Sequence, residues 1–150
     1  MQIGRKLIHL ESVDSTNNYA ANLVKSEGLS SGTVILADEQ FAGRGQRGAE
    51  WVVEPGMNLT FSVYLEVANL SVEKQFDLSK LVAISICQFL EKLGIRSEIK
   101  WPNDILVSGR KIAGVLIENS ISRTGPMRSI VGIGINAVSY THLTLPTSTH

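Results

Sequence analysis

Hydrophobic and polar positions alternate most regularly around residues 59–65. Leu59, Phe61, Val63 and Leu65 are separated there by polar residues or a tyrosine. A period of two is typical of a β-strand that buries one face. Shorter apolar or β-branched runs predict six further strands, at residues 5–11, 33–38, 97–100, 105–107, 112–117 and 128–135. The last four predicted strands include a hairpin, because Ser108-Gly109-Arg110 separates two of them.

Two segments instead show helical spacing. The first can be capped by Asp14 or Ser15 and ends at Gly28. Its apolar positions are Tyr19, Ala20, Leu23 and Val24. The second covers residues 73–93 and ends at Gly94, with apolar positions that include Phe76, Leu81, Ile84, Phe89 and Leu93. Because helices are few and strands often follow strands, the predicted class is α+β.

Composition narrows the class of protein. The chain has 150 residues, of which 43% are hydrophobic and 19% charged, which predicts one globular domain. Fourteen basic residues balance fourteen acidic ones, so no broad field favours nucleic acid or an anionic membrane. Cys87 is the single cysteine, which excludes an intrachain disulfide and a cysteine zinc cluster. The sequence shows no signal peptide or membrane span, and we expect a cytoplasmic location.

The C-terminal residues differ from the rest. No charged residue follows Arg128, and residues 139–150 are rich in threonine without either periodicity. We therefore predict a domain over residues 1–138 and a non-native or disordered tail over residues 139–150. A foreign extension and a genuine disordered C-terminus are both compatible with this composition.

A loop rich in glycine and arginine follows the second predicted strand. Three glycines and two arginines within residues 43–48 give a backbone that can approach a ligand closely and bind phosphate or carboxylate. An ordinary surface loop explains the glycines about equally well. The loop is not a Walker A motif, because Ala49-Glu50 stands where Lys-Ser/Thr is required.

Three further clusters have both a chemical and a plainer explanation. Lys100 to Asp104, followed by Lys111 and Gly114, could hold phosphate or metal-bound phosphate, or could be a plain turn with a solvated lysine. Residues 14–17 could bind a polar ring, or simply cap a helix. Residues 132–137 fit a loose dinucleotide-binding pattern, but no helix pattern follows them.

In this order, the clusters resemble the successive motifs of biotin protein ligases over residues 5–137. The residues that carry the resemblance are Ser15-Thr16-Asn17, Gln40, Gly43-Arg44-Gly45, Trp51, Lys100 to Asp104, Arg110-Lys111, Ala113-Gly114 and Gly132 to Asn136. The resemblance implies a biotin/lipoate protein ligase-like catalytic core. In such a core a mixed, largely antiparallel sheet has helices packed on one side.

The resemblance also implies roles for individual residues. Biotin would be bound by Ser15, Thr16, Asn17, Gln40, Gly43, Arg44 and Gly114. The nucleotide would be bound by Arg47, Trp51, Asn103 and Asn136. Lys111 and Arg44 would be catalytic, and Asp104 would hold Mg²⁺. Gln46 and Ala49 depart from the family pattern, in which arginines often help to retain the adenylate.

The implied reaction uses ATP and Mg²⁺ to activate biotin, then transfers it to a lysine of a biotin carboxyl carrier domain. Such a reaction requires positioning and charge stabilisation rather than an enzyme nucleophile. We expect no DNA or membrane binding. A homodimer and a monomer are both compatible with the sequence. A lipoate-type protein ligase and a non-catalytic, truncated biotin-binding fragment are the competing hypotheses.

Overall fold

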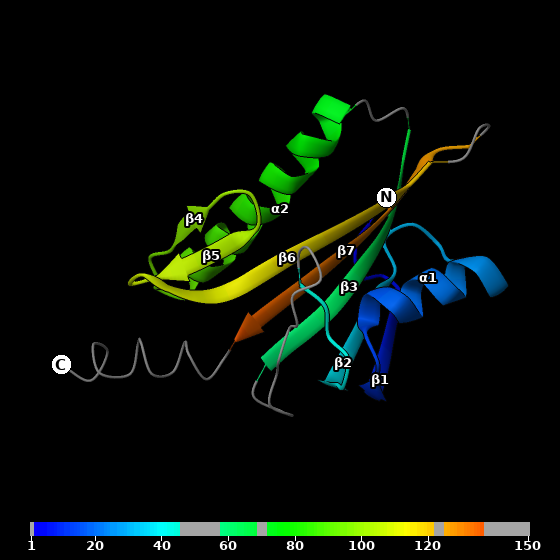
Figure 1. The fold of residues 1–150 in the computed structure, drawn as a ribbon, viewed down its shortest axis with the longest axis horizontal. Coiled ribbons are helices and arrows are strands. Elements are labelled where there is room, and N and C mark those ends of the chain that lie inside the picture. Colours follow the sequence, from blue (N-terminus) through cyan, green and yellow to red (C-terminus); the bar gives the residue numbers. More distant parts are fainter. Residues whose placement is uncertain (1, 46–57, 69–71, 122–124, 137–150) are drawn as a thin grey trace.

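The computed structural model describes residues 2–45, 58–68, 72–121 and 125–136 (Figure 1). Seven strands and two helices follow one another along these residues. Their bounds are β1 (Leu7–Val13), α1 (Thr16–Ser26), β2 (Val34–Gln40), β3 (Asn58–Val67), α2 (Val72–Lys92), β4 (Glu98–Lys100), β5 (Asp104–Val107), β6 (Arg110–Ser120) and β7 (Met127–Asn136). Each predicted element is present, with its ends moved by a few residues.

The strands form one sheet in the order β1-β2-β3-β7-β6-β5-β4. Only β1 and β2 are parallel, and α1 connects them, because parallel neighbours require a crossover. The other neighbouring pairs are antiparallel. The predicted α+β class with a mixed, largely antiparallel sheet is therefore confirmed.

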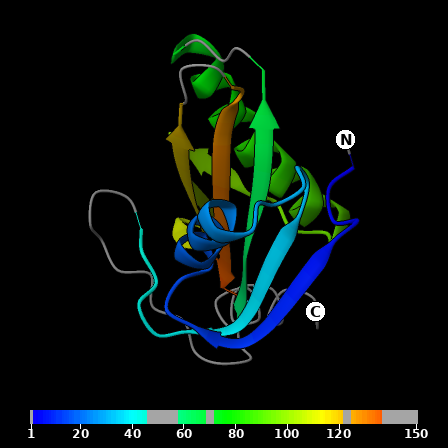
Figure 2. The same ribbon diagram turned by 90° about the vertical axis from the view of Figure 1, so that its right-hand side faces the viewer.

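The two helices lie on opposite faces of this sheet (Figure 2). On β3, the Ser62 hydroxyl lies 2.7 Å from Thr16 Oγ1 of α1. Its neighbour Val63 points the other way and belongs to the core cluster that contains Ile86 and Leu90 of α2. Side chains alternate between the two faces along a strand, so β3 contacts α1 on one face of the sheet and α2 on the other. The structure thus corrects one detail of the expected architecture, in which both helices pack on one side.

Helix α2 buries a narrow face and leaves much apolar surface exposed. Ala83, Ile86 and Leu90 are at most 5% exposed and pack on the sheet. The five residues that marked the helical spacing are between 43% and 62% exposed: Phe76, Leu81, Ile84, Phe89 and Leu93. An apolar groove runs between α2 and strands β3 and β7. The apolar spacing thus located the helix without identifying its buried side.

Within the described residues, neither helix is long and apolar enough to cross a membrane.

An irregularity in the β5–β6 hairpin reorients Lys111. Ser108 and Gly109 both have positive φ, of 52° and 79°, as a tight two-residue hairpin turn requires. The pairing then shifts, because Ile105 faces Ala113 whereas Leu106 faces Lys111, so Ile112 is the extra residue of a β-bulge. Ile112 is fully buried, and the bulge directs Lys111 to the same face as Gly114.

Candidate functional site

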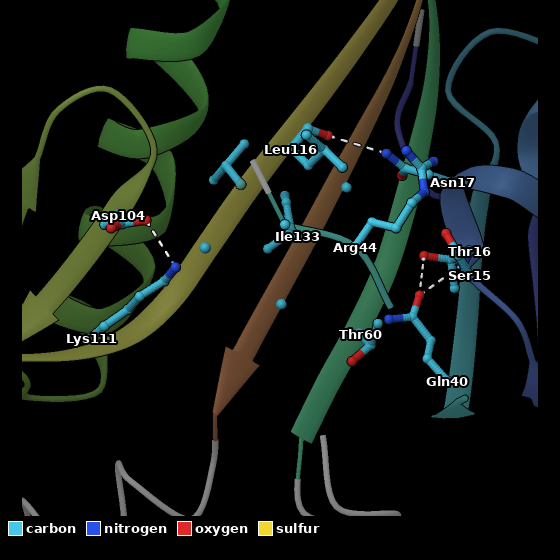
Figure 3. Close-up of a pocket in the computed structure, with 15 residues that line it drawn as sticks. Ser15, Thr16, Asn17, Gln40, Arg44, Thr60, Asp104, Lys111, Leu116 and Ile133 are labelled. Carbon is cyan, nitrogen blue, oxygen red and sulfur yellow. Dashed lines mark hydrogen bonds and ion pairs between the residues drawn. The ribbon is translucent and has the colours of Figure 1, made fainter. Parts of the chain in front are cut away.

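A cavity lies on the sheet face that carries α1 (Figure 3). It is formed by the N-terminus of α1, the end of β2, the glycine-arginine loop and strands β3, β5, β6 and β7. The residues that line it are Ser15, Thr16, Asn17, Gln40, Arg44, Gly45, Thr60, Asp104, Lys111, Gly114, Val115, Leu116, Gly132, Ile133 and Gly134. Segments far apart in sequence therefore share one site.

The floor of the cavity is a row of residues that crosses four strands. Thr60 of β3 pairs with Gly134 of β7, Gly134 with Gly114 of β6, and Gly114 with Asp104 of β5. Three strand spacings separate the ends of the row, or roughly 14 Å. The two central glycines lack side chains, so an elongated ligand can lie flat across the strands between a polar end at Thr60 and a charged end at Asp104.

Helix α1 supplies the polar end through its first residues. Ser15 caps the helix, and its hydroxyl oxygen accepts a hydrogen bond from the Asn18 amide at 3.2 Å. The Thr16 amide donates to Gln40 Oε1 at 2.8 Å, and the Thr16 hydroxyl lies 3.2 Å from the same oxygen. Ser15 and Thr16 are at most 3% exposed. Their capping geometry thus also fixes hydroxyl and amide groups at the cavity.

Asn17 fastens α1 to the sheet. Its Nδ2 donates to the Leu116 carbonyl at 3.3 Å and to Glu118 Oε1 at 3.0 Å, and its Oδ1 lies 2.5 Å from the Ser62 hydroxyl. Gly132 lies directly beneath this amide, where an added Cβ would lie 2.6 Å from Asn17 Oδ1. The glycine therefore permits the close approach of helix and strand.

Arg44 is held by a carboxylate 74 residues further along the chain. Its Nη1 and Nη2 donate to Glu118 Oε2 at 3.0 Å and Oε1 at 2.8 Å, and Nη2 also donates to Asn18 Oδ1 at 2.7 Å. The hydrogen bond from Arg44 lowers the pKa of Glu118 below its ordinary value of 4.5. The same bond raises the pKa of Arg44. The bidentate pair fixes the beginning of the glycine-arginine loop on β6.

This ion pair predicts a pH dependence of stability. Because the folded pKa of Glu118 is lowered, its contribution is complete above the unfolded pKa and is lost as pH falls through the folded pKa. Wild type should exceed Glu118→Gln in unfolding free energy near neutral pH, and the difference should shrink as pH falls below the ordinary glutamate pKa of 4.5. Urea unfolding at neutral and acidic pH measures the difference. Glu11→Gln, at an exposed position of β1, is the control, and a difference independent of pH would contradict the assignment.

Lys111 supplies the charged end of the cavity. Its Nζ lies 3.0 Å from Asp104 Oδ1, and both side chains are partly exposed, at 45% and 33%. Figure 3 shows this pair across the cavity from Gln40 and Thr16. A lysine ammonium at the open end of a glycine floor can receive a carboxylate or a phosphate.

The structure brings eight of the predicted site residues together at this cavity: Ser15, Thr16, Asn17, Gln40, Arg44, Asp104, Lys111 and Gly114. Gly43, Asn103 and Asn136 are described but do not line it. Asn103 is buried, and its Nδ2 donates to the Val115 carbonyl at 2.9 Å, which ties the turn to a cavity strand. Arg47 and Trp51, like Gln46, Ala49 and the predicted tail, lie outside the described residues.

Sequence reasoning missed three residues of this site. The sequence patterns place Thr60 and Ser62 in a strand without a functional role and give Glu118 no role at all, although Glu118 bonds Arg44 and Asn17 and the other two face the α1 side. The available signal was weak: two hydroxyl residues occupy alternate positions of an otherwise apolar strand. Residues 2–45, 58–68, 72–121 and 125–136 contain no group of three or more His, Cys, Asp or Glu that could hold a metal ion.

Comparison with known proteins identifies the family. The chain is 41% identical over 133 residues to a biotin--[acetyl-CoA-carboxylase] ligase of Paracoccus denitrificans, covering 85% of this chain and 52% of that protein. It is 35% identical over 135 residues to the bifunctional ligase/repressor BirA of Bacillus subtilis, covering 89% of this chain and 41% of that protein. The chain thus spans about half the length of the curated relatives it matches.

Solved structures agree with these sequence relatives. The biotin protein ligase from Aquifex aeolicus in complex with biotin and ATP superimposes with a TM-score of 0.70 at 35% identity, covering 88% of this chain and 52% of that one. The model of the biotin/lipoate A/B protein ligase family matches residues 9–136. This chain belongs to the biotin/lipoate A/B protein ligase family.

Proposed function

We propose that the chain carries the catalytic core of a biotin protein ligase, which activates biotin with ATP and transfers it to a lysine of a biotin carboxyl carrier domain. The observation that carries this proposal is the row from Thr60 to Asp104, with glycines between a hydroxyl- and amide-rich end and a lysine. Biotin has the matching order of groups, because an aliphatic chain joins its polar ureido ring to a carboxylate. The relatives named as biotin ligases support this match.

In this proposal the ring lies at the α1 end of the cavity. Ser15, Thr16 and Gln40 would hydrogen-bond the ureido group, with Asn17 holding the helix in place. Backbone groups of Arg44 would close the same end, and Gly114 would lie beneath the aliphatic chain. Gly43, which precedes Arg44, remains predicted to contact biotin. Since Glu118 already binds the Arg44 guanidinium, we assign that side chain to positioning of the loop rather than to phosphate binding.

The chemistry follows from the other end. The biotin carboxylate would attack the α-phosphorus of ATP and expel pyrophosphate, and the acceptor lysine would then attack the mixed anhydride and release AMP. Lys111 would hold the carboxylate and stabilise charge on the α-phosphate. Neither step requires an enzyme nucleophile, so positioning carries most of the catalysis. Arg47, Trp51, Asn103 and Asn136 remain predicted to contact the nucleotide.

Asp104 is compatible with a magnesium ion bound together with ATP. Mg²⁺ in nucleotide sites is commonly held by one or two carboxylates and by phosphate oxygens, and Asp104 is a partly exposed carboxylate on the cavity wall. A bound ion there would neutralise phosphate charge. Asp104 would share its oxygens between the ion and Lys111.

Two competing functions have specific support. The family includes lipoate as well as biotin ligases, so a lipoate-type reaction has to be tested. The chain spans about half of its relatives' length, so a biotin-binding module without turnover is the second competing function.

One relative is named a ligase and repressor, yet the neutral charge of this chain still predicts no DNA binding. A homodimer and a cytoplasmic location remain predictions.

Mass spectrometry of an acceptor domain tests the proposal directly. After incubation with the chain, biotin, ATP and Mg²⁺, we expect the acceptor to gain the mass of one biotinyl group. Omission of ATP should prevent the gain, and lipoate should release less pyrophosphate than biotin does. Biotin binding by calorimetry without any transfer would support the non-catalytic module, and preference for lipoate or absence of biotin binding would contradict the proposal.

A further inference from the structure

Thr60 presents an unusual hydroxyl group in the cavity wall. The residue is 5% exposed, and its Oγ1 is shielded from solvent. Among the described residues, this oxygen has no hydrogen-bond partner. A buried polar group without a partner costs free energy, on the order of 1–3 kcal/mol, so such groups are rare unless they serve another purpose.

The sheet explains why no side chain of the described strands bonds this hydroxyl. The direct cross-strand neighbours of Thr60 are Ala37 on β2 and Gly134 on β7, neither of which has a polar side chain. Beyond Gly134 the row continues with Gly114. Thr60 therefore lines the edge of the glycine floor, and rotation about its Cα–Cβ bond would turn the shielded hydroxyl toward a ligand lying on that floor.

The other polar groups at this end show which partners a ligand must offer. Gln40 Oε1 is occupied by Thr16, and the Ser15 oxygen accepts from the Asn18 amide. Within the described part of the chain, the donors at this end that make no hydrogen bond include the Ser15 hydroxyl hydrogen, Gln40 Nε2 and the Thr60 hydroxyl. Figure 3 places Thr60 beside Gln40, away from Lys111. These groups complement a ring that has both a carbonyl acceptor and N–H donors.

We propose that the Thr60 hydroxyl is a further ligand-binding group, which hydrogen-bonds the ureido ring of biotin and favours that ring over an apolar one. This inference rests on the proposed function. It makes Thr60 a specificity-determining residue, because a site built to hydrogen-bond a polar ring discriminates against rings that lack such groups. The cost of the unpartnered hydroxyl is then borne by the free protein and recovered on binding.

This role predicts opposite effects of one substitution on stability and on binding. Valine has nearly the shape of threonine but replaces the hydroxyl with a methyl group. If ligand supplies the missing partner, Thr60→Val should leave the melting temperature of the free protein unchanged or raise it, because it removes an unsatisfied polar atom. The same change should weaken biotin binding about tenfold, whereas Thr60→Ser should bind within about twofold of wild type.

Ser97→Ala is a matched control. Ser97 Oγ is the same kind of shielded hydroxyl without a partner among the described residues, but it lies near Cys87 and Arg96, outside the cavity. Its removal should not lower the melting temperature or change biotin affinity. Thr60→Val and Ser97→Ala therefore each remove a hydroxyl without a partner among the described residues, but only the Thr60 hydroxyl lies at the proposed ligand site.

Calorimetry with biotin alone and thermal unfolding without ligand decide the matter. Weaker binding by Thr60→Val, without loss of free-state stability, supports the inference. A lower melting temperature would show that the hydroxyl has a partner within the protein, and unchanged affinity would show that biotin does not contact it; either result overturns the inference alone. Absence of biotin binding by the wild-type chain would overturn the proposed function, and this inference with it.

Discussion

Lys111→Ala is expected to abolish formation of the adenylate, by at least about 100-fold, with biotin binding partly kept. The bulge at Ile112 brings the Lys111 ammonium to the cavity face, and alanine supplies no charge there. The ring end, some 14 Å away across the glycine floor, keeps its hydrogen bonds. Biotin affinity should therefore change far less than the rate.

Mass spectrometry of biotinyl-5'-AMP, without acceptor protein, measures this rate, and calorimetry with biotin measures binding. Arg110→Ala is the matched control, because Arg110 is the preceding cation of the same hairpin and is not among the residues that line the cavity. Its adenylate yield should equal that of wild type. Wild-type yield from Lys111→Ala would remove Lys111 from the reaction.

Gly132→Ala should lower the free energy of unfolding by about 2 kcal/mol and the melting temperature by roughly 4–8 °C. The added Cβ would lie 2.6 Å from Asn17 Oδ1 and 3.0 Å from Asn17 Cγ. Asn17 is 4% exposed and bonded to Leu116, Glu118 and Ser62, so it has no low-energy alternative position. Thr16, which immediately precedes Asn17, lines the cavity, so a displaced Asn17 should also weaken biotin binding.

A double-mutant cycle isolates this clash. In an Asn17→Ala background the amide is gone, so Gly132→Ala should cost much less stability than it does in wild type. Chemical unfolding of the four proteins gives the coupling free energy. Equal costs in both backgrounds would mean that Asn17 is not what limits position 132.

The local patterns of this sequence were enough to predict its elements. Ser15 caps α1, Gly28 follows its end with positive φ, and the alternation from Leu59 to Leu65 gives β3. Local rules worked here because capping, turn formation and side-chain alternation depend on a few neighbouring residues.

The features that build the cavity depend on distant partners instead. Glu118 lies 74 residues from Arg44, and the row from Thr60 to Gly134 and Gly114 exists only once β3, β7 and β6 are in register. The resemblance to biotin ligases identified most of the lining residues without that register. It left out Thr60 and Glu118, whose importance comes from their cross-sheet neighbours.

The placement of the helices on opposite faces means that successive positions of one strand control different properties. Along residues 59–65, odd-numbered side chains belong to the apolar interior and groove, whereas Thr60 and Ser62 belong to the ligand side. A substitution scan of this strand should separate into two interleaved classes: changes at the odd-numbered positions should alter stability alone, whereas changes at Thr60 and Ser62 should also alter ligand binding. Evolution or design can therefore retune recognition at every second position while the interior is left intact.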